Sequence, residues 1–112
     1  FNFKNGRLYK VVDIINSNTI KLNTGLVVKL LGVVINDEDA AIKYLTEYVL
    51  KKEIFLKFDD VEVIDQDTVE AYVYLKNKIF INSYLIKSGM AIADRSCQYQ
   101  YKNKFIEIEA EV

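Results

Sequence analysis

Apolar and polar residues alternate in three short segments over the first third of the chain. The segments cover residues 7–15, 19–22 and 26–35 and are rich in β-branched and aromatic side chains, which favour strands. Asn16-Ser17-Asn18 and Asn23-Thr24-Gly25 separate them, and asparagine and glycine are typical of tight turns. The pattern predicts three strands joined as a meander.

The next segment has the period of a helix. Three acidic residues at 37–39 lie where a helix N-terminus favours negative charge. Ala41, Leu45 and Val49 then recur at helical spacing, and two lysines follow. We therefore expect a helix from Asp37 to Lys51. Strand-like alternation returns at 53–58 and 68–75, and a turn at 76–78 directs the chain towards residues 79–81.

Two helices are expected in the remainder of the chain. One runs from about Asn82 to Ser88, and Gly89 suits the position that follows a helix end. The other covers Tyr101 to Val112, where apolar residues at 105, 108 and 112 form one stripe among lysines and glutamates. Together these elements predict an α+β domain, mainly β, with a small barrel and about three helices.

Composition narrows the possible functions. The 112 residues are 51% hydrophobic and 28% charged, which fits one globular domain spanning 1–112. No apolar run approaches the roughly 20 residues of a membrane-spanning helix, so we expect no membrane segment in this chain. The absence of histidine excludes Ser-His-Asp triads and histidine metal sites. The net charge is −1, whereas domains that grip nucleic acid usually carry a basic excess.

Residues 28–37, Val-Lys-Leu-Leu-Gly-Val-Val-Ile-Asn-Asp, resemble the active-site strand of the staphylococcal-nuclease-like (thermonuclease) family, roughly R-L-I-G-I-D-A-P-E. Further segments resemble other motifs of that family in the same order. They are 12–22 (its V-x-D-G-D-T-h-x-L opening), 71–75 (L-A-Y-V-Y), 82–91 (N-x-x-L-V-x-x-G-L-A) and 101–109 (its closing helix). The resemblance implies a five-stranded OB-fold barrel with added helices.

The reactive positions of that family are altered in this chain. Its phosphate-binding arginine falls on Lys29, a calcium-binding aspartate on Val34, and a glutamate proposed as general base on Asp37. A second calcium ligand falls on Asn18, and a second arginine on Thr68, or on Val69 if the alignment shifts by one residue. Valine offers no ligand atom, and asparagine lacks the charge that gives a calcium site its affinity. The resemblance thus implies the shape of a nuclease without its chemistry.

We interpret the chain as a non-catalytic, nuclease-like binding module for a protein partner or, weakly, for single-stranded nucleic acid, with no cofactor. Degenerate copies of the domain act as scaffolds in Tudor-containing members of the resembled family, and we expect this chain, which starts at Phe1, to be part of a longer protein. One alternative is a calcium-dependent phosphodiesterase with an altered site built on Asp37 and loop carboxylates. Another is a structural subunit packed in an oligomer.

Tyrosines beside lysines are the candidate nucleic-acid-binding residues. Tyr72 and Tyr74 lie near Lys76 and Lys78 in sequence, and single strands bind by stacking bases on aromatic rings beside cations. Lys29 is the candidate phosphate contact retained at the active-site strand. The competing interpretation is that alternating strand aromatics pack in or near the core.

Overall fold

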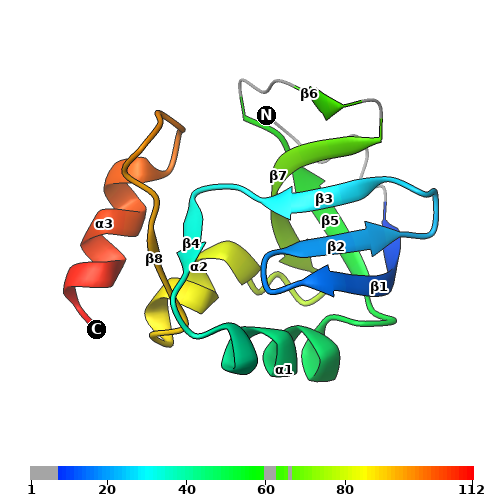
Figure 1. Ribbon diagram of the computed structural model, residues 1–112, viewed down its shortest axis with the longest axis horizontal. Helices are drawn as coiled ribbons and strands as arrows, with labels where there is room; N and C mark the ends of the chain where they lie inside the picture. The colour runs from blue at the N-terminus through cyan, green and yellow to red at the C-terminus, as the bar shows by residue number, and fades with distance from the viewer. Residues whose placement is uncertain (1–7, 60–62, 66) are drawn as a thin grey trace.

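A computed structural model describes residues 8–59, 63–65 and 67–112 (Figure 1). The fold is mixed α+β, with a five-stranded sheet that closes into a ring and three helices. The ring strands, in their order around the ring, are β1 (Tyr9–Asn16), β2 (Thr19–Leu22), β3 (Val27–Leu30), β7 (Thr68–Leu75) and β5 (Glu53–Lys57). Around the ring, β3 and β7 pair in parallel and the other neighbours pair antiparallel.

Three further strands lie outside the ring. β6 (Val63–Asp65) pairs with β7, whereas β4 (Val33–Ile35) and β8 (Ala91–Ala93) form a separate two-stranded sheet. The helices are α1 (Glu38–Tyr48), α2 (Ile81–Lys87) and α3 (Lys102–Ala110). In Figure 1, α1 runs beneath the ring, and α3 lies beyond β8 on the side away from β1 and β2. No helix in the described ranges is both long and apolar enough to cross a membrane.

The expected strand over 26–35 is wrong in one respect, because the chain breaks into β3 and β4. Gly32, at the break, has a φ of +84°, a conformation that side chains with a Cβ rarely adopt. An added Cβ there would lie 2.7 Å from Tyr99 Cε2 and 2.8 Å from Phe105 Cε2. The hydrophobic pattern does not reveal the break, because Leu31 and Val33 are both buried.

The other expected elements are present with ends that differ by up to three residues, whereas β6 and β8 were not expected. Asp37 is the N-cap of α1 rather than its first residue, and the helix ends at Tyr48. After the turn at 76–78, Phe80 makes one isolated bridge with Tyr74 and then caps α2. The last helix ends at Ala110, so the apolar side chain at 112 is exposed instead of packed.

Asn82 fastens α2 to the ring. Its side chain is fully buried, and its Oδ1 accepts from Val73 N at 2.9 Å. Its Nδ2 donates to Leu31 O at 2.8 Å and to Ala71 O at 3.3 Å. Each such bond contributes about 1 kcal/mol, but leaving these buried groups unpaired would cost more. Asn82 therefore fixes both the end of β3 and the path of β7.

Candidate functional site

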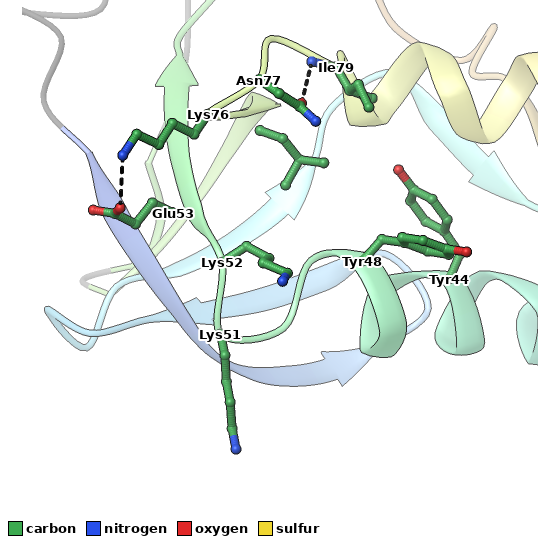
Figure 2. Close-up of a pocket in the computed structure, with 9 residues that line it drawn as sticks. Tyr44, Tyr48, Lys51, Lys52, Glu53, Lys76, Asn77 and Ile79 are labelled. Carbon is green, nitrogen blue, oxygen red and sulfur yellow. Dashed lines mark hydrogen bonds and ion pairs between the residues drawn. The ribbon is translucent and has the colours of Figure 1, made fainter.

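Pockets lie near both ends of α1. Near its N-terminal end, a pocket of about 450 Å³ includes Glu38 in its lining. Near its C-terminal end, a pocket of about 600 Å³ is lined by Tyr44 and Tyr48, among others (Figure 2). The first, which we call the α1 N-terminal pocket, contains Asn18, Lys29 and Val34, three of the positions singled out in the sequence.

The α1 N-terminal pocket brings together residues that are distant in sequence. Asn18 comes from the β1–β2 turn, Lys29 from β3 and Val34 from β4, and all three line the pocket. Three carboxylates join them: Glu38, Glu70 and Asp94. Three of the five positions that align with reactive residues of the resembled family therefore share one concave site.

Lys29 and Glu70 face this pocket because of the ring pairing. Val28 and Leu30 are buried on β3, so the intervening Lys29 is exposed on the opposite face. Glu70 is the pairing partner of Lys29 where β3 and β7 run in parallel. Sequence reasoning missed Glu70 because this pairing joins segments 41 positions apart and left no local pattern.

The pocket does not fit calcium in the manner of the resembled family. Val34 has no ligand atom, and the Oδ1 of Asn18 already accepts a hydrogen bond from the Thr19 hydroxyl at 2.9 Å. Calcium takes six to eight oxygen ligands, with carboxylates supplying charge. Within the described ranges, no three or more Asp, Glu, Cys or His residues are grouped so as to hold a metal ion.

Asp37 and Thr68 lie outside the pocket lining. The Asp37 carboxylate caps α1, accepting from Ala40 N at 3.1 Å, a role worth about 1 kcal/mol. Thr68 is half-buried at the start of β7, where it pairs with Val27. Neither Asp37 nor Thr68 therefore contributes to the lining of the pocket that contains Lys29.

The charge of the pocket disfavours phosphate. One lysine against three carboxylates gives the lining a formal charge of −2. A concave surface of one sign repels ligands of the same sign. A nucleic-acid strand approaching Lys29 would meet Glu38, Glu70 and Asp94 around it.

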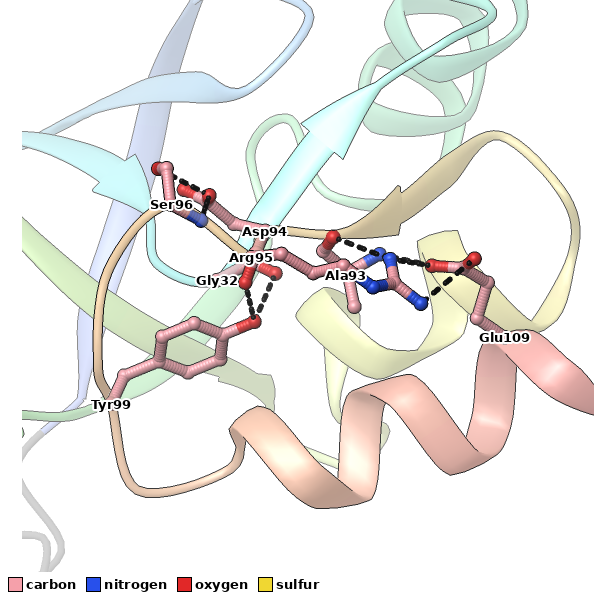
Figure 3. A network of polar contacts seen from close by, with 7 residues as sticks. All are labelled: Gly32, Ala93, Asp94, Arg95, Ser96, Tyr99 and Glu109. Atoms are coloured by element: carbon pink, nitrogen blue, oxygen red, sulfur yellow. Dashed lines mark hydrogen bonds and ion pairs between the residues drawn. The ribbon is translucent and has the colours of Figure 1, made fainter.

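Asp94 and the residues after it are held in a polar network (Figure 3). The Asp94 carboxylate accepts from Ser96 N at 2.8 Å and from Ser96 Oγ at 2.6 Å. The bond from the Ser96 hydroxyl is the main reason that the pKa of Asp94 lies below its ordinary value. The hydroxyl of Tyr99 donates to the backbone oxygen of Asp94 at 2.6 Å. Asp94 therefore remains ionised at neutral pH.

Arg95 joins the same network and turns away from the pocket. It pairs with Glu109 of α3, with Arg95 Nη1 2.9 Å from Glu109 Oε1 and Nη2 3.3 Å from Oε2 (Figure 3). Glu109 Oε1 also accepts from Ala93 N at 2.8 Å. The pair ties β8 to α3, so Arg95 serves the fold rather than replacing a missing phosphate-binding arginine.

Cys97 is exposed but is not an activated nucleophile. Partial burial and the carboxylates of Asp94 and Glu70 raise the pKa of its thiol. The thiolate is the reactive form. Cys97 is therefore a protonated thiol at neutral pH.

The candidate nucleic-acid residues do not form one surface. Tyr72 is fully buried, and its hydroxyl donates to Asp59 at 2.7 Å, so no base can stack on it. Tyr74 is partly buried and stacks on Phe80, with ring centroids 4.3 Å apart. Lys76 lines the pocket near the C-terminal end of α1 and Lys78 adjoins it, whereas Lys29 lies in the α1 N-terminal pocket.

Tyr44 and Tyr48 are better placed than Tyr72 and Tyr74 to contact a ligand, because they line a pocket. The sequence reasoning did not single them out as candidate binding residues. They are four residues apart on α1 and line the larger pocket. Residues at this spacing lie on the same helix face. The sequence signal for this site was the four-residue spacing of the two tyrosines, with Lys51 and Lys52 three and four positions after Tyr48.

Comparison with protein-family models and with curated protein sequences gave no match. The likeness to the nuclease family rests on the motifs alone. Function is accordingly argued from the residues of the two pockets.

Proposed function

We propose that the chain is a non-catalytic, nuclease-like OB-fold module that acts by binding. The observation that carries this proposal is the lining of the α1 N-terminal pocket. Asn18, Lys29 and Val34 stand at the altered positions, and the other charges present are carboxylates. Phosphodiester cleavage by such a site requires a bound cation and fixed positive charge, and losing one stabilising group typically lowers the rate about 10²–10³-fold.

The fold gives independent support to the OB-type part of the proposal. The ring has five strands, and α1 lies between β3 and β5 in the chain, as suits a small OB barrel. The hydrogen bonds of Asn82 to Leu31 and Ala71 join three of the segments that resemble nuclease motifs. One buried side chain thus links three of the segments on which the resemblance rests.

The surface of the pocket suits a protein partner better than nucleic acid. Val34 and Ile92 are directly paired between β4 and β8 and are 44% and 37% exposed. Directly paired residues project from the same face of a sheet. An exposed apolar pair beside carboxylates is complementary to a protein segment that carries an apolar side chain next to lysine or arginine.

Catalysis is tested by incubating single-stranded DNA and RNA with the chain in millimolar calcium, beside an Asp37→Ala variant. We expect no cleavage by either protein. Cleavage by the unmodified chain that Asp37→Ala abolishes would contradict the proposal. It would instead support a calcium-dependent phosphodiesterase with an altered site, for which the carboxylates of the pocket are the available groups.

The type of partner is tested by titrating the ¹⁵N-labelled chain with a leucine- and arginine-rich peptide and, separately, with oligothymidylate at low salt. The peptide should shift the amide resonances of Lys29, Val34 and Glu70, and Val34→Ser should weaken that response. Val34 is exposed, so this substitution leaves the core intact. If oligothymidylate shifts these resonances and the peptide does not, the pocket recognises phosphate and the proposed protein partner is wrong.

A further inference from the structure

The pocket at the C-terminal end of α1, the Tyr–Lys groove, combines aromatic and basic side chains (Figure 2). Tyr44 and Tyr48 project from α1, and Leu75 and Ile79 contribute an apolar surface near the end of β7. The remaining lining residues are Lys51, Lys52, Glu53, Lys76 and Asn77. Its volume of about 600 Å³ lies within the range of small-ligand sites.

Three tyrosine rings form a continuous row beside the groove. Tyr84 stacks on Tyr44 with ring centroids 4.8 Å apart, and Tyr44 lies 5.3 Å from Tyr48. Tyr48 ends the row and is 56% exposed. Burial, followed by the neighbouring tyrosines, raises the pKa of Tyr44 to about 12, so its hydroxyl remains a hydrogen-bond donor. The exposed ring of Tyr48 is available for another planar group to continue the row.

The groove is basic although the chain as a whole is slightly acidic. Lys51, Lys52 and Lys76 line it, and Lys78 lies between two lining residues. Glu53, its one acidic lining residue, pairs with Lys76 at 3.5 Å; both side chains are largely exposed, so this pair is weak. Three lining lysines against one lining glutamate give the groove a formal charge of +2, in a chain of net charge −1.

Two of these lysines occupy backbone conformations that favour glycine. Within the described ranges, Lys51 (φ +67°) and Lys78 (φ +74°) are the residues other than glycine that have positive φ. Such a conformation is costly for a residue with a Cβ, and strained positions of this kind cluster at binding sites. Lys51 lines the groove, and Lys78 lies in the chain between the lining residues Asn77 and Ile79.

Main-chain hydrogen bonds hold both turns in place. Lys51 N donates to Val11 O at 2.8 Å, which anchors the turn after α1 to β1. Lys78 N donates to Leu75 O at 2.7 Å and closes the turn after β7. In Figure 2, Lys52 extends toward Tyr48, whereas Lys51 extends away from it on the same turn. The backbone of the groove is therefore fixed, and the long lysine side chains can adjust to a ligand.

We propose that the Tyr–Lys groove binds a nucleotide unit, either free or within a single strand, with the base stacked on Tyr48 and the phosphate held by the surrounding lysines. Aromatic stacking beside cations is the chemistry by which proteins bind single strands without reading sequence. An acidic peptide would match the lysines but would have no planar group for the Tyr48 ring. The inference goes beyond the proposed function, because the groove shares no residue with the α1 N-terminal pocket.

Fluorescence anisotropy of labelled oligothymidylate at two salt concentrations tests this inference. Thymidine monophosphate and a poly-glutamate peptide serve as competitors. We expect salt-dependent binding that Tyr48→Ala weakens about tenfold and that Lys51→Gly/Lys78→Gly weakens with a shallower salt dependence. The double glycine variant should keep or raise the melting temperature, because glycine adopts positive φ more readily. Loss of binding without loss of stability separates a ligand-binding role from a structural one.

Lys87→Ala/Lys104→Ala is the matched control, because it removes the same charge from exposed positions outside the groove. It should leave binding close to that of the unmodified chain. Competition by the monophosphate would identify a free nucleotide as sufficient, and competition by unlabelled oligothymidylate alone would identify a strand. Absence of binding at low salt, equal loss in the control, or equally effective competition by poly-glutamate would overturn the inference. Oligonucleotide cleavage would contradict the proposed function but not this site.

Discussion

Tyr99 closes over Gly32. The Tyr99 hydroxyl lies 3.2 Å from Gly32 O, and its ring atom Cε2 would lie 2.7 Å from a Cβ placed on Gly32. This contact between segments 67 positions apart ends β3 and turns the chain into β4. It therefore helps to place Lys29 on one side of the turn and Val34 on the other, where both line the α1 N-terminal pocket.

Gly32→Ala should destabilise the protein by about 2–4 kcal/mol in urea unfolding. A φ of +84° strains any residue with a Cβ, and crowding against Tyr99 and Phe105 adds an overpacking cost. Gly25→Ala is the control, because Gly25 also has positive φ but has no atom near the added Cβ. It should cost only about 1 kcal/mol. Equal costs at the two positions would show that the contact with Tyr99 is unimportant.

Asn82→Ala should cost about 2–4 kcal/mol, because it leaves Val73 N, Leu31 O and Ala71 O without their buried partner. Asn103→Ala, on the exposed surface of α3, should change stability by no more than about 0.5 kcal/mol. Chemical unfolding followed by circular dichroism measures both. A small cost at Asn82 would mean that α2 is held by apolar packing alone.

Acid should destabilise the protein through Asp94 and Glu109. The Ser96 hydroxyl lowers the pKa of Asp94, and Arg95 lowers that of Glu109. Both groups are thus more acidic in the folded state, so their stabilising effect is full above their ordinary pKa values of 3.8 and 4.5. It is lost as the pH falls through the lower, folded values.

The unfolding midpoint in urea, followed from about pH 7 to about pH 3, checks this dependence. The Glu109→Gln variant should be less stable than the unmodified chain near neutral pH and should lose less stability on acidification. A midpoint that falls equally in both proteins would exclude a contribution from the Arg95–Glu109 pair.

Cys97 should react slowly with iodoacetamide at neutral pH, despite its exposure. Asp94 and Glu70 contribute to the raised pKa of its thiol, which lowers the thiolate fraction. Asp94→Asn should speed alkylation, and the rate should continue to rise with pH beyond the range of an ordinary cysteine. Alkylation faster than that of a free thiol would contradict this electrostatic picture.

Local signals in the sequence predicted most elements but not the features that depend on distant contacts. Asp37 at the start of α1 and the bounds of β2 and β7 followed from capping and alternation. The break at Gly32 depends on Tyr99 and Phe105, which no pattern near residue 32 reveals.

The same distinction holds for the sites. Resemblance to known motifs identified Asn18, Lys29 and Val34, which the structure places in one pocket. Glu70 was not identified from the sequence, because it lies in that pocket only through the long-range pairing of β3 with β7. Tyr72, a candidate for base stacking whose competing interpretation was core packing, is buried, and alternation along β7 does not reveal that both faces of the strand are covered near residues 71–73.

The central claim is that the α1 N-terminal pocket keeps the positions of a nuclease site without its charges. The most direct test is a calcium titration of the ¹⁵N-labelled chain, compared with an Asn18→Asp/Val34→Asp variant that restores both carboxylates. We predict that millimolar calcium produces no saturable shift of the Lys29, Val34 and Glu70 amide resonances in the unmodified chain and a saturable shift at these positions in the variant. Saturable shifts centred on these residues in the unmodified chain would contradict the claim.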